Sequence, residues 1–272
     1  MLFSNTFQAA LFILLTTTAT LVQAEDGKLI PYAKVDDNFY VLLSDVDGSN
    51  VGVNVAENGL IIVDTMLPKA GDKLTATIRD ISDKPVKFVI NTHDHMDHTG
   101  NNKYFLELGA TALTQDNITN NKQLKVVTST AASHSTNDLL VYFPDNNVLM
   151  MGDTFTNNWY PTFWTGGLKG QINVINKALE LSDEDTVVVP GHGFITDSNG
   201  LKQYRDNNIE WVNRIMELHA KGLNIETIVQ DKELHSILEK FANDARPVAD
   251  LERVMQRFVE KTIKIELKLA QK

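Results

Sequence analysis

The sequence predicts a mixed α/β fold that ends in a helical segment, and three observations lead to this fold class. Short apolar runs of strand length alternate with longer stretches that have helical spacing. Two turn sequences, Asn58-Gly59 and the Pro-Asp-Asn-Asn stretch at 144–147, each separate two apolar runs and therefore predict hairpins. From Gly200 onward the chain has the spacing of helices, so no further strand is expected there.

The first half of the chain is predicted to supply strands and two connecting helices. Val51, Val53 and Val55 alternate with other residues, which is typical of a half-buried strand. Lys84-Pro85 ends the first helix and Gly109 ends the second. Strands are expected at Phe39–Leu43, Val51–Val55, Leu60–Val63 and Val86–Ile90, and helices at Lys69–Ile81 and Asn101–Leu108.

The second half is predicted to add a second set of strands before the helical segment. Strands are expected at Leu139–Phe143, Val148–Met151 and Thr186–Val189, with a helix at Ile172–Leu181. After Pro247, an apolar stripe at helical spacing predicts one continuous amphipathic helix. Its members are Leu251, Val254, Phe258, Thr262 and Ile265. Since no repeat or long linker interrupts the chain, we expect residues 25–272 to form a single domain.

Four of the predicted apolar strands are followed by a residue that can bind a metal or orient a ligand. These residues are Asp64, His93, Asp153 and His192. Functional sites in α/β proteins gather where strand ends and loops meet on a rigid scaffold. The pattern therefore predicts that these side chains share one rim of the fold.

The composition limits the chemistry that such a rim can perform. The chain has 272 residues, seven histidines and no cysteine, so thiolate metal sites, disulfides and cysteine nucleophiles are excluded. Its net charge of −10 argues against a nucleic-acid partner, because binding phosphate backbones requires a basic surface. Histidine and carboxylate side chains must then provide any transition-metal site, and a small molecule is the expected partner.

The N-terminal segment predicts export. Residues 1–24 carry no charged side chain, and the apolar run ends at Val22-Gln23-Ala24, where small residues suit signal peptidase. We expect a signal peptide at 1–24, cleaved after about Ala24, and a periplasmic or secreted protein with no stable membrane insertion after cleavage. The absence of Lys and Arg from Met1–Gln8 departs from this pattern and leaves a buried first helix as the alternative.

The segment 91–100 concentrates potential metal ligands. It reads Asn-Thr-His-Asp-His-Met-Asp-His-Thr-Gly. In an extended stretch His93 and His95 face the same way and can bind one ion, whereas Asp97 and His98 project to another side and suit a second ion. Neutral imidazole and carboxylate ligands favour zinc, with iron or manganese as substitutes. We therefore expect two Zn²⁺ ions side by side.

This segment resembles the defining motif of the metallo-β-lactamase-fold hydrolase superfamily, and further motifs follow in the same order as in that family. They are 58–65 (Asn-Gly-Leu-Ile-Ile-Val-Asp-Thr), 134–138 (His-Ser-Thr-Asn-Asp), 152–154 (Gly-Asp-Thr) and 190–193 (Pro-Gly-His-Gly). The resemblance covers about residues 35–200. It implies a four-layer αββα sandwich with a dinuclear site along one edge of the two sheets, followed by the helical segment 201–272.

The resemblance also implies a role for each motif residue. By this likeness the first ion is bound by His93, His95 and His134, the second by Asp97, His98 and His192, and both by Asp153 together with a water. Asp64 and Asp138 match acidic positions of the family, and such carboxylates orient ligand imidazoles. Turn capping is the alternative for these two residues.

A shared hydroxide between two zinc ions is a nucleophile near neutral pH, so the hypothesis is hydrolysis of a carbonyl compound: an ester, lactone, thioester or amide such as a β-lactam. Asp97 is the candidate catalytic residue, which steers the hydroxide and relays a proton. A bridging aspartate resembles the broad hydrolase branches of the family more than its dedicated β-lactamases.

Other functions stay open beside this hypothesis. The enzyme alternatives are a dedicated β-lactamase that hydrolyses antibiotics and a glyoxalase II-like thioesterase, although Thr92-His93-Asp94-His95 lacks the three consecutive histidines of the latter. The flavin-partnered diiron proteins of the fold are disfavoured, since His95 stands where they use an acidic ligand. The non-enzyme alternative is an exported zinc-binding or accessory protein, which would need a closed coordination sphere.

The aromatic residues after Asp153 suggest how a substrate is held. Trp159, Tyr160, Phe163 and Trp164 lie within six residues of one another and predict an apolar wall or lid for an uncharged or aromatic substrate, with Trp159 and Tyr160 lining it. Packing on the core is the alternative. The C-terminal helices are expected to cover the sandwich or to form a homodimer contact.

Overall fold

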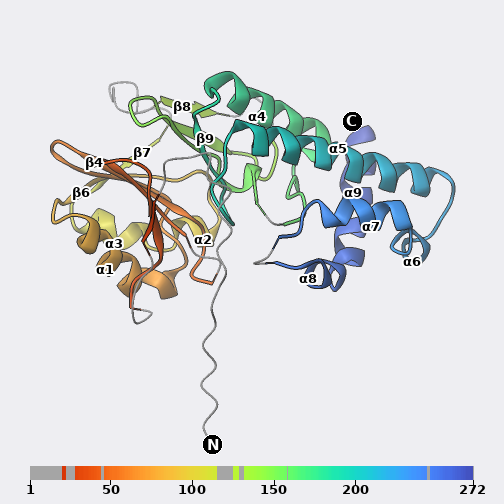
Figure 1. Cartoon of the computed structure of the whole chain (residues 1–272), viewed down its shortest axis with the longest axis horizontal. Helices are drawn as coiled ribbons and strands as arrows, with labels where there is room; N and C mark the ends of the chain where they lie inside the picture. Colours follow the sequence, from red (N-terminus) through yellow and green to blue (C-terminus); the bar gives the residue numbers. More distant parts are fainter. Residues whose placement is uncertain are drawn as a thin grey trace, which may run out of the picture.

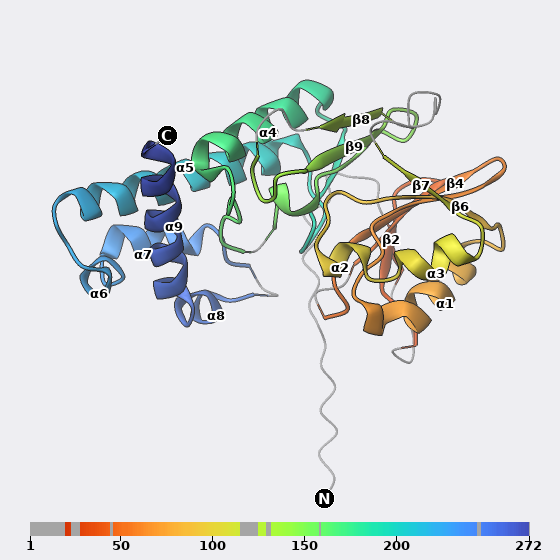
Figure 2. The same ribbon diagram turned by 180° about the vertical axis from the view of Figure 1, so that it is seen from behind.

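The computed structural model describes residues 20–22, 28–43, 46–114, 125–128, 132–157, 159–243 and 246–271. Two β-sheets and the helices that flank them make up these residues, as Figure 1 shows. Helices α1 to α3 lie beside the larger sheet, and helices α5 to α9 gather at the opposite end of the molecule. Figure 2 shows the same arrangement from behind.

The larger sheet has seven strands in sequence order, β1 to β7. Strands β1 to β5 pair antiparallel with their neighbours, whereas β5, β6 and β7 run parallel. The strands are β1 (Thr20–Val22), β2 (Tyr32–Lys34), β3 (Phe39–Leu42), β4 (Val51–Ala56), β5 (Gly59–Val63), β6 (Val86–Ile90) and β7 (Thr111–Leu113).

The smaller sheet has four strands in the order β11-β10-β9-β8. Strand β11 pairs parallel with β10, and the other pairs are antiparallel. The strands are β8 (Lys125–Thr128), β9 (Leu139–Phe143), β10 (Val148–Met150) and β11 (Val187–Val189).

The helices connect the strands in the first part of the chain and form a cluster in the last part. The connecting helices are α1 (Gly71–Ile81), α2 (Met96–Thr99), α3 (Asn102–Glu107) and α4 (Gly167–Leu181), with 3₁₀ turns at Pro68–Ala70 and Gly152–Thr154. The final cluster comprises α5 (Ser198–Ala220), α6 (Ile225–Ile228), α7 (Lys232–Glu239), α8 (Val248–Glu252) and α9 (Met255–Ala270). None of the described helices is long and apolar enough to cross a membrane.

Strand alternation creates the layers. In β5, Ile61 and Val63 point into a core between the two sheets, while Leu60 and Ile62 point to the opposite core under α1 and α3. A third core joins the outer face of the smaller sheet to α4, α5 and the final helices. This order of layers is the predicted αββα sandwich with a helical C-terminal segment.

Most predicted elements appear within a few residues of their expected bounds, and the differences have physical reasons. The strand at 51–55 is not half-buried: residues 51–54 are all buried, because both faces of the large sheet are covered. Helix α4 begins at Gly167 instead of Ile172, and its first turn contains Gly170, where a Cβ would collide with the Ala132 carbonyl. The single helix expected after Pro247 is broken into α8 and α9, because Val254 leaves the helical conformation.

The N-terminal prediction falls mostly outside the described residues. Within 1–24 the structure describes Thr20–Val22, which pairs antiparallel with β2 as β1. Signal cleavage and export remain predictions.

Candidate metal centre

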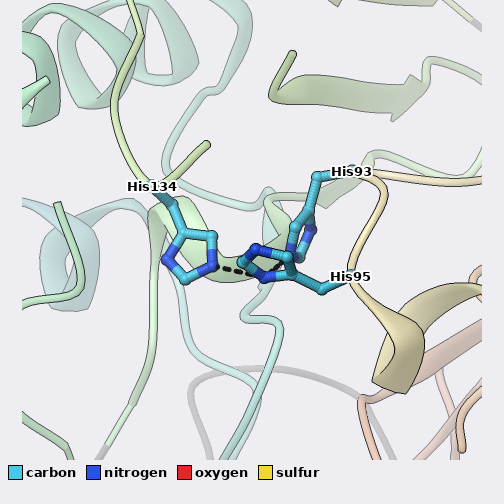
Figure 3. A group of neighbouring side chains, drawn as sticks. All are labelled: His93, His95 and His134. Atoms are coloured by element: carbon cyan, nitrogen blue, oxygen red, sulfur yellow. Dashed lines mark hydrogen bonds between the residues drawn. The ribbon is translucent and has the colours of Figure 1, made fainter. Parts of the chain in front are cut away.

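Three histidines from two loops form the first ligand group, shown in Figure 3. His93 follows β6 and His95 precedes α2, and His93 Nε2 lies 2.9 Å from His95 Nδ1. His134 reaches them from the loop before β9, with its Nε2 3.0 Å from the same His95 nitrogen. His93 and His134 are buried, whereas His95 is exposed. The three rings thus converge on one point from different directions.

The second ligand group combines α2 with the loop after β11. Asp97 and His98 lie on α2, and His192 follows β11. His192 Nε2 lies 3.2 Å from Asp97 Oδ2, which in turn is 3.9 Å from His98 Nε2. The ligand atoms of these three residues lie within 4.8 Å of one another. Asp97 and His98 are thus neighbours on one turn of a short helix. The sequence analysis expected an extended stretch and did not predict this helix.

Asp153 lies between the two groups and presents one carboxylate oxygen to each. Its Oδ2 is 3.5 Å from His134 Nε2, and its Oδ1 is 3.2 Å from His98 Nε2 and 3.4 Å from His192 Nε2. Gly152 makes this placement feasible: it has φ +53°, and a Cβ there would lie 2.5 Å from Thr92 Oγ1. The seven predicted metal ligands are therefore adjacent in the structure.

The arrangement fits metal ions better than it fits a hydrogen-bonded polar cluster. Ligand atoms around a tetrahedral zinc, at about 2.0–2.1 Å from the ion, lie roughly 3.3 Å apart. The separations between 2.9 and 3.5 Å within the cluster agree with that spacing. In the described part of the chain, the buried atoms His98 Nε2 and Asp153 Oδ1 have no hydrogen-bond partner. Buried polar atoms rarely stay unpaired, so these two are oriented as ligands.

Comparisons with known proteins identify the fold in which this cluster lies. Residues 44–113 match the family model of the metallo-beta-lactamase superfamily. The fold is similar to that of VMB-1, with a TM-score of 0.53 and 19% sequence identity over 67% of this chain and 97% of that one. It is also similar to a metallo-beta-lactamase from Erythrobacter litoralis, with a TM-score of 0.57 and 12% identity over 70% of this chain and 100% of that one. This chain therefore has the metallo-β-lactamase fold.

A third similar structure extends the comparison into the helical segment. The stereoselective inverting sec-alkylsulfatase Pisa1 from Pseudomonas sp. has a TM-score of 0.57 and 17% identity, and the match covers 83% of this chain and 50% of that one. That share of this chain is larger than the first 200 of its 272 residues. Part of the helical segment therefore has a structural counterpart in that protein.

Asp64 is the carboxylate that supports the second ligand group. It is buried at the end of β5 and adopts φ +66°, a left-handed conformation that aspartate and asparagine tolerate best after glycine. One oxygen accepts from Thr92 N, and the other accepts from Thr92 Oγ1 and lies by His98 Nδ1, each at 2.8 Å. With Nδ1 donating to Asp64, the other ring nitrogen of His98 faces Asp153, and it would have to lose its proton to bind a metal.

Asp138 stabilises a turn, which is the alternative role considered for it in the sequence. Its described hydrogen bonds go to Ser133 and Ser135 and not to a ligand imidazole. It accepts from the backbone N–H and hydroxyl of Ser135 and from the Ser133 N–H, so it shapes the loop that carries His134. The group that orients His134 is instead the Thr162 carbonyl, which accepts from Nδ1 at 2.8 Å. The expectation that Asp138 orients an imidazole was wrong, and Thr92 and Thr162 are supporting residues that the motif did not reveal.

Burial and mutual charge set the protonation of the cluster. Burial lowers the pKa of His93 to about 2, with a further contribution from His98, so His93 is neutral and able to bind a metal. Burial alone would raise the pKa of Asp153, but His192 and His98 hold it well below its usual value. Burial would also raise the pKa of Asp97, yet its hydrogen bond with His192 lowers it to about 2. Both carboxylates are therefore ionised at neutral pH.

A cavity of about 360 Å³ opens beside the cluster. Trp159 lines it, whereas Tyr160 does not. Tyr160 is fully buried, stacks on Phe258 with 4.2 Å between ring centroids, and donates its hydroxyl to the Leu251 carbonyl. The described lining residues are His134, Asp153, Thr156, Trp159, Thr162, Trp164, His192, Arg246, Arg257, Phe258 and Lys261.

The wall of this cavity is not purely apolar, contrary to the expectation from the aromatic run. Arg246, Arg257 and Lys261 reach it from the helical segment that follows α7. The C-terminal helices therefore cover the metal centre through α9 and the loop before α8. Trp211 and Ile215 of α5 are buried in the core, in agreement with the expectation that the C-terminal helices cover the sandwich.

Proposed function

We propose that this protein is a dinuclear zinc hydrolase with a bridging aspartate that acts, after export, on the carbonyl group of a small-molecule ester, lactone, thioester or amide. The observation that carries the proposal is the position of Asp153, whose two oxygens face two separate ligand groups at 3.2–3.5 Å. A single buried carboxylate in this position suits two ions held close together.

The residues divide into two binding sets. His93, His95 and His134 would hold one ion, and Asp97, His98 and His192 the other. Asp153, which also groups with His93 and His98, would be common to both. When bound, two zinc ions lower the pKa of a water to near neutrality and polarise a substrate carbonyl. Iron or manganese could replace zinc with the same ligand types.

Asp97 is the residue proposed to manage the proton. Its side chain is 33% exposed, in contrast to the buried Asp153, so it can meet both substrate and solvent. The ionised carboxylate can accept a hydrogen bond from the attacking water and hold it in line with the carbonyl carbon. It then receives the proton transiently and passes it to the leaving group, which is general acid–base catalysis by one side chain.

The open cavity favours catalysis over metal storage. A storage or structural site has a closed coordination sphere, whereas a catalytic site keeps a face open to substrate. Here the cavity of about 360 Å³ is lined by His134, Asp153 and His192, which are members of the ligand set. A zinc-binding accessory protein would have no need for this access.

The decisive experiment is a hydrolysis screen of the zinc-loaded protein. The screen spans β-lactams, lactones, thioesters, including those cleaved by glyoxalase II, aryl esters, phosphodiesters and sulfate esters, each with and without a chelator. We expect turnover of at least one carbonyl class that chelation abolishes and zinc restores. Turnover that the chelator does not reduce, or the absence of turnover for every class of substrate, would contradict the proposal.

A further inference from the structure

A buried glutamine joins the two loops that carry His134 and Asp153. Gln171 lies on α4 and is fully buried. Its carboxamide oxygen accepts a hydrogen bond from Ser133 Oγ at 2.7 Å, and its amide nitrogen donates to the Thr154 carbonyl. Ser133 precedes His134 in the chain, and Thr154 follows Asp153. One side chain therefore holds the neighbours of two residues of the metal cluster.

The start of α4 is itself fixed to the first of these loops. The Gly166 N–H donates to the Ser133 carbonyl at 2.9 Å. A Cβ at Gly166 or Gly170 would collide with the Ala132 carbonyl, so the helix approaches the loop as closely as glycine allows. The backbone that carries Gln171 is therefore held against the loop by contacts of its own.

Thr162 makes a second connection between His134 and Asp153. Its hydroxyl donates to the Asp153 carbonyl at 2.7 Å, and its own carbonyl accepts from His134 Nδ1 at 2.8 Å. The facing atoms of the two connected residues, His134 Nε2 and Asp153 Oδ2, are 3.5 Å apart. Thr162 lines the cavity beside the cluster, whereas Gln171 is not among the described lining residues. Gln171 can therefore act on the metal centre only by positioning other residues.

We propose that Gln171 is a positioning residue, which holds the loop of His134 against the turn of Asp153 and so sets the geometry of the first ligand group. In that group His93 and His95 belong to one segment and His134 comes from another, as Figure 3 shows. The third ligand therefore depends on contacts between loops. An amide suits this role because it both donates and accepts hydrogen bonds without carrying a charge. This inference rests on the proposed function, since it assigns a residue that supports the metal centre of that site.

Gln171→Met keeps the approximate length of the side chain and removes both hydrogen bonds. The Ser133 hydroxyl and the Thr154 carbonyl lose this partner in a buried place, so the two loops are no longer held together there. Replacing a residue that supports a metal ligand typically lowers metal affinity by about 10- to 100-fold. We expect a loss of this size for zinc at the first ligand group. The second group keeps its contact with Asp64, so its affinity should stay within about twofold.

Two proteins that each bind one zinc ion measure the groups separately. His192→Ala disables the second group and His95→Ala disables the first. In titration calorimetry, adding Gln171→Met should weaken zinc binding to the His192→Ala protein and leave that of the His95→Ala protein within about twofold. Asn173→Leu is the matched control, because it removes an exposed amide from the same helix and should change neither affinity. Equal losses in both proteins, or no loss in either, would overturn the proposal.

The metal-free protein offers a spectroscopic test. The His134 Nδ1 proton is buried and bonded to the Thr162 carbonyl, so its NMR signal should exchange slowly with water and be assigned by its loss in His134→Ala. We expect exchange at least about tenfold faster in Gln171→Met and unchanged in Asn173→Leu; unchanged exchange in Gln171→Met would contradict the proposal. If Gln171→Met does not fold, Ser133→Ala removes one of its two hydrogen bonds and should weaken zinc at the first group by about two- to tenfold.

Neither measurement requires turnover, so the two proposals can fail separately. If the hydrolysis screen finds no substrate but zinc affinity and proton exchange change as expected, the hydrolase proposal fails and the role of Gln171 stands. If a substrate is hydrolysed and Gln171→Met changes neither quantity, the role of Gln171 fails and the hydrolase stands.

Discussion

Replacing Asp64 by Asn tests how the second ligand group is held. The carboxylate serves Thr92 N, Thr92 Oγ1 and His98 Nδ1, each at 2.8 Å. Asparagine tolerates the left-handed backbone at φ +66°, so the turn can keep its shape. An amide has only one oxygen, however, and its NH₂ would face His98 Nδ1. The ring would then favour the tautomer that carries its proton on Nε2, the atom directed at Asp153.

The size of the effect follows from these contacts. Loss of a hydrogen bond to a charged group costs about 1.5–3 kcal/mol, which corresponds to about a 10- to 100-fold loss of affinity for the ion bound by Asp97, His98 and His192. A loss of 10- to 100-fold is also typical when the residue that orients a metal-binding histidine is replaced. The ion bound by His93, His95 and His134 loses no ligand and should bind almost as before.

Titration calorimetry and metal analysis after dialysis measure this difference. The wild-type protein should bind two zinc ions tightly, whereas the Asp64→Asn protein should bind one ion tightly and one weakly. Circular dichroism should show that the fold of the variant persists. Asp94→Asn is the matched control, because Asp94 is exposed in the loop between β6 and α2 and its replacement removes the same charge. Two ions bound with wild-type affinity in Asp64→Asn would refute the assigned role of Asp64.

Three further predictions address catalysis, protonation and stability. Asp97→Asn should lower kcat by about 10²- to 10⁴-fold with the fold intact, because it removes the proton acceptor; near-normal turnover in a steady-state assay would disprove that role. Burial would lower the pKa of His98, but two neighbouring carboxylates raise it well above its usual value. Zinc binding should therefore release protons and tighten as pH rises, which calorimetry in buffers of different ionisation enthalpy will detect. Asp231 caps α7 and accepts two hydrogen bonds from Arg214 of α5, at 2.6 and 2.9 Å. Asp231→Ala removes these contacts, so it should reduce the free energy of unfolding, measured by urea titration, by about 1–3 kcal/mol. Since the hydrogen bond with Arg214 lowers the pKa of Asp231, this stabilisation is complete above about pH 4 and lost as pH falls through the lowered pKa.

The parts of the fold that could be predicted are those whose sequence pattern has a local cause. The Asn58-Gly59 turn sets the β4–β5 hairpin, and the alternation in β5 follows from two cores on opposite faces of the sheet. The strands β2, β7 and β8 were not predicted, because runs of three or four residues are too short to show a period. Their partners across the sheet determine that they are strands.

The candidate site likewise contains residues that could be predicted from the sequence and residues that could not. The residues that gather in the cluster could be predicted because metal binding restricts both residue type and spacing, as in the segment 93–98. Thr162 could not be predicted, since it contributes a backbone carbonyl that any residue at that position would supply. Asp138 has a side chain that suits either a turn or an imidazole, and the contacts with Ser133 and Ser135 decide for the turn.

The basic residues that line the cavity have no sequence signature, for a different reason. Arg257 and Lys261 occur on an amphipathic helix among other charged residues, where cations usually do no more than keep the exposed face soluble. They line the cavity only because α9 packs against the loop that carries Trp159 and Trp164. Metal binding restricts residue type and spacing, whereas many kinds of side chain can line a cavity. The sequence could therefore predict the residues of the cluster but not those that α9 adds to the cavity beside it.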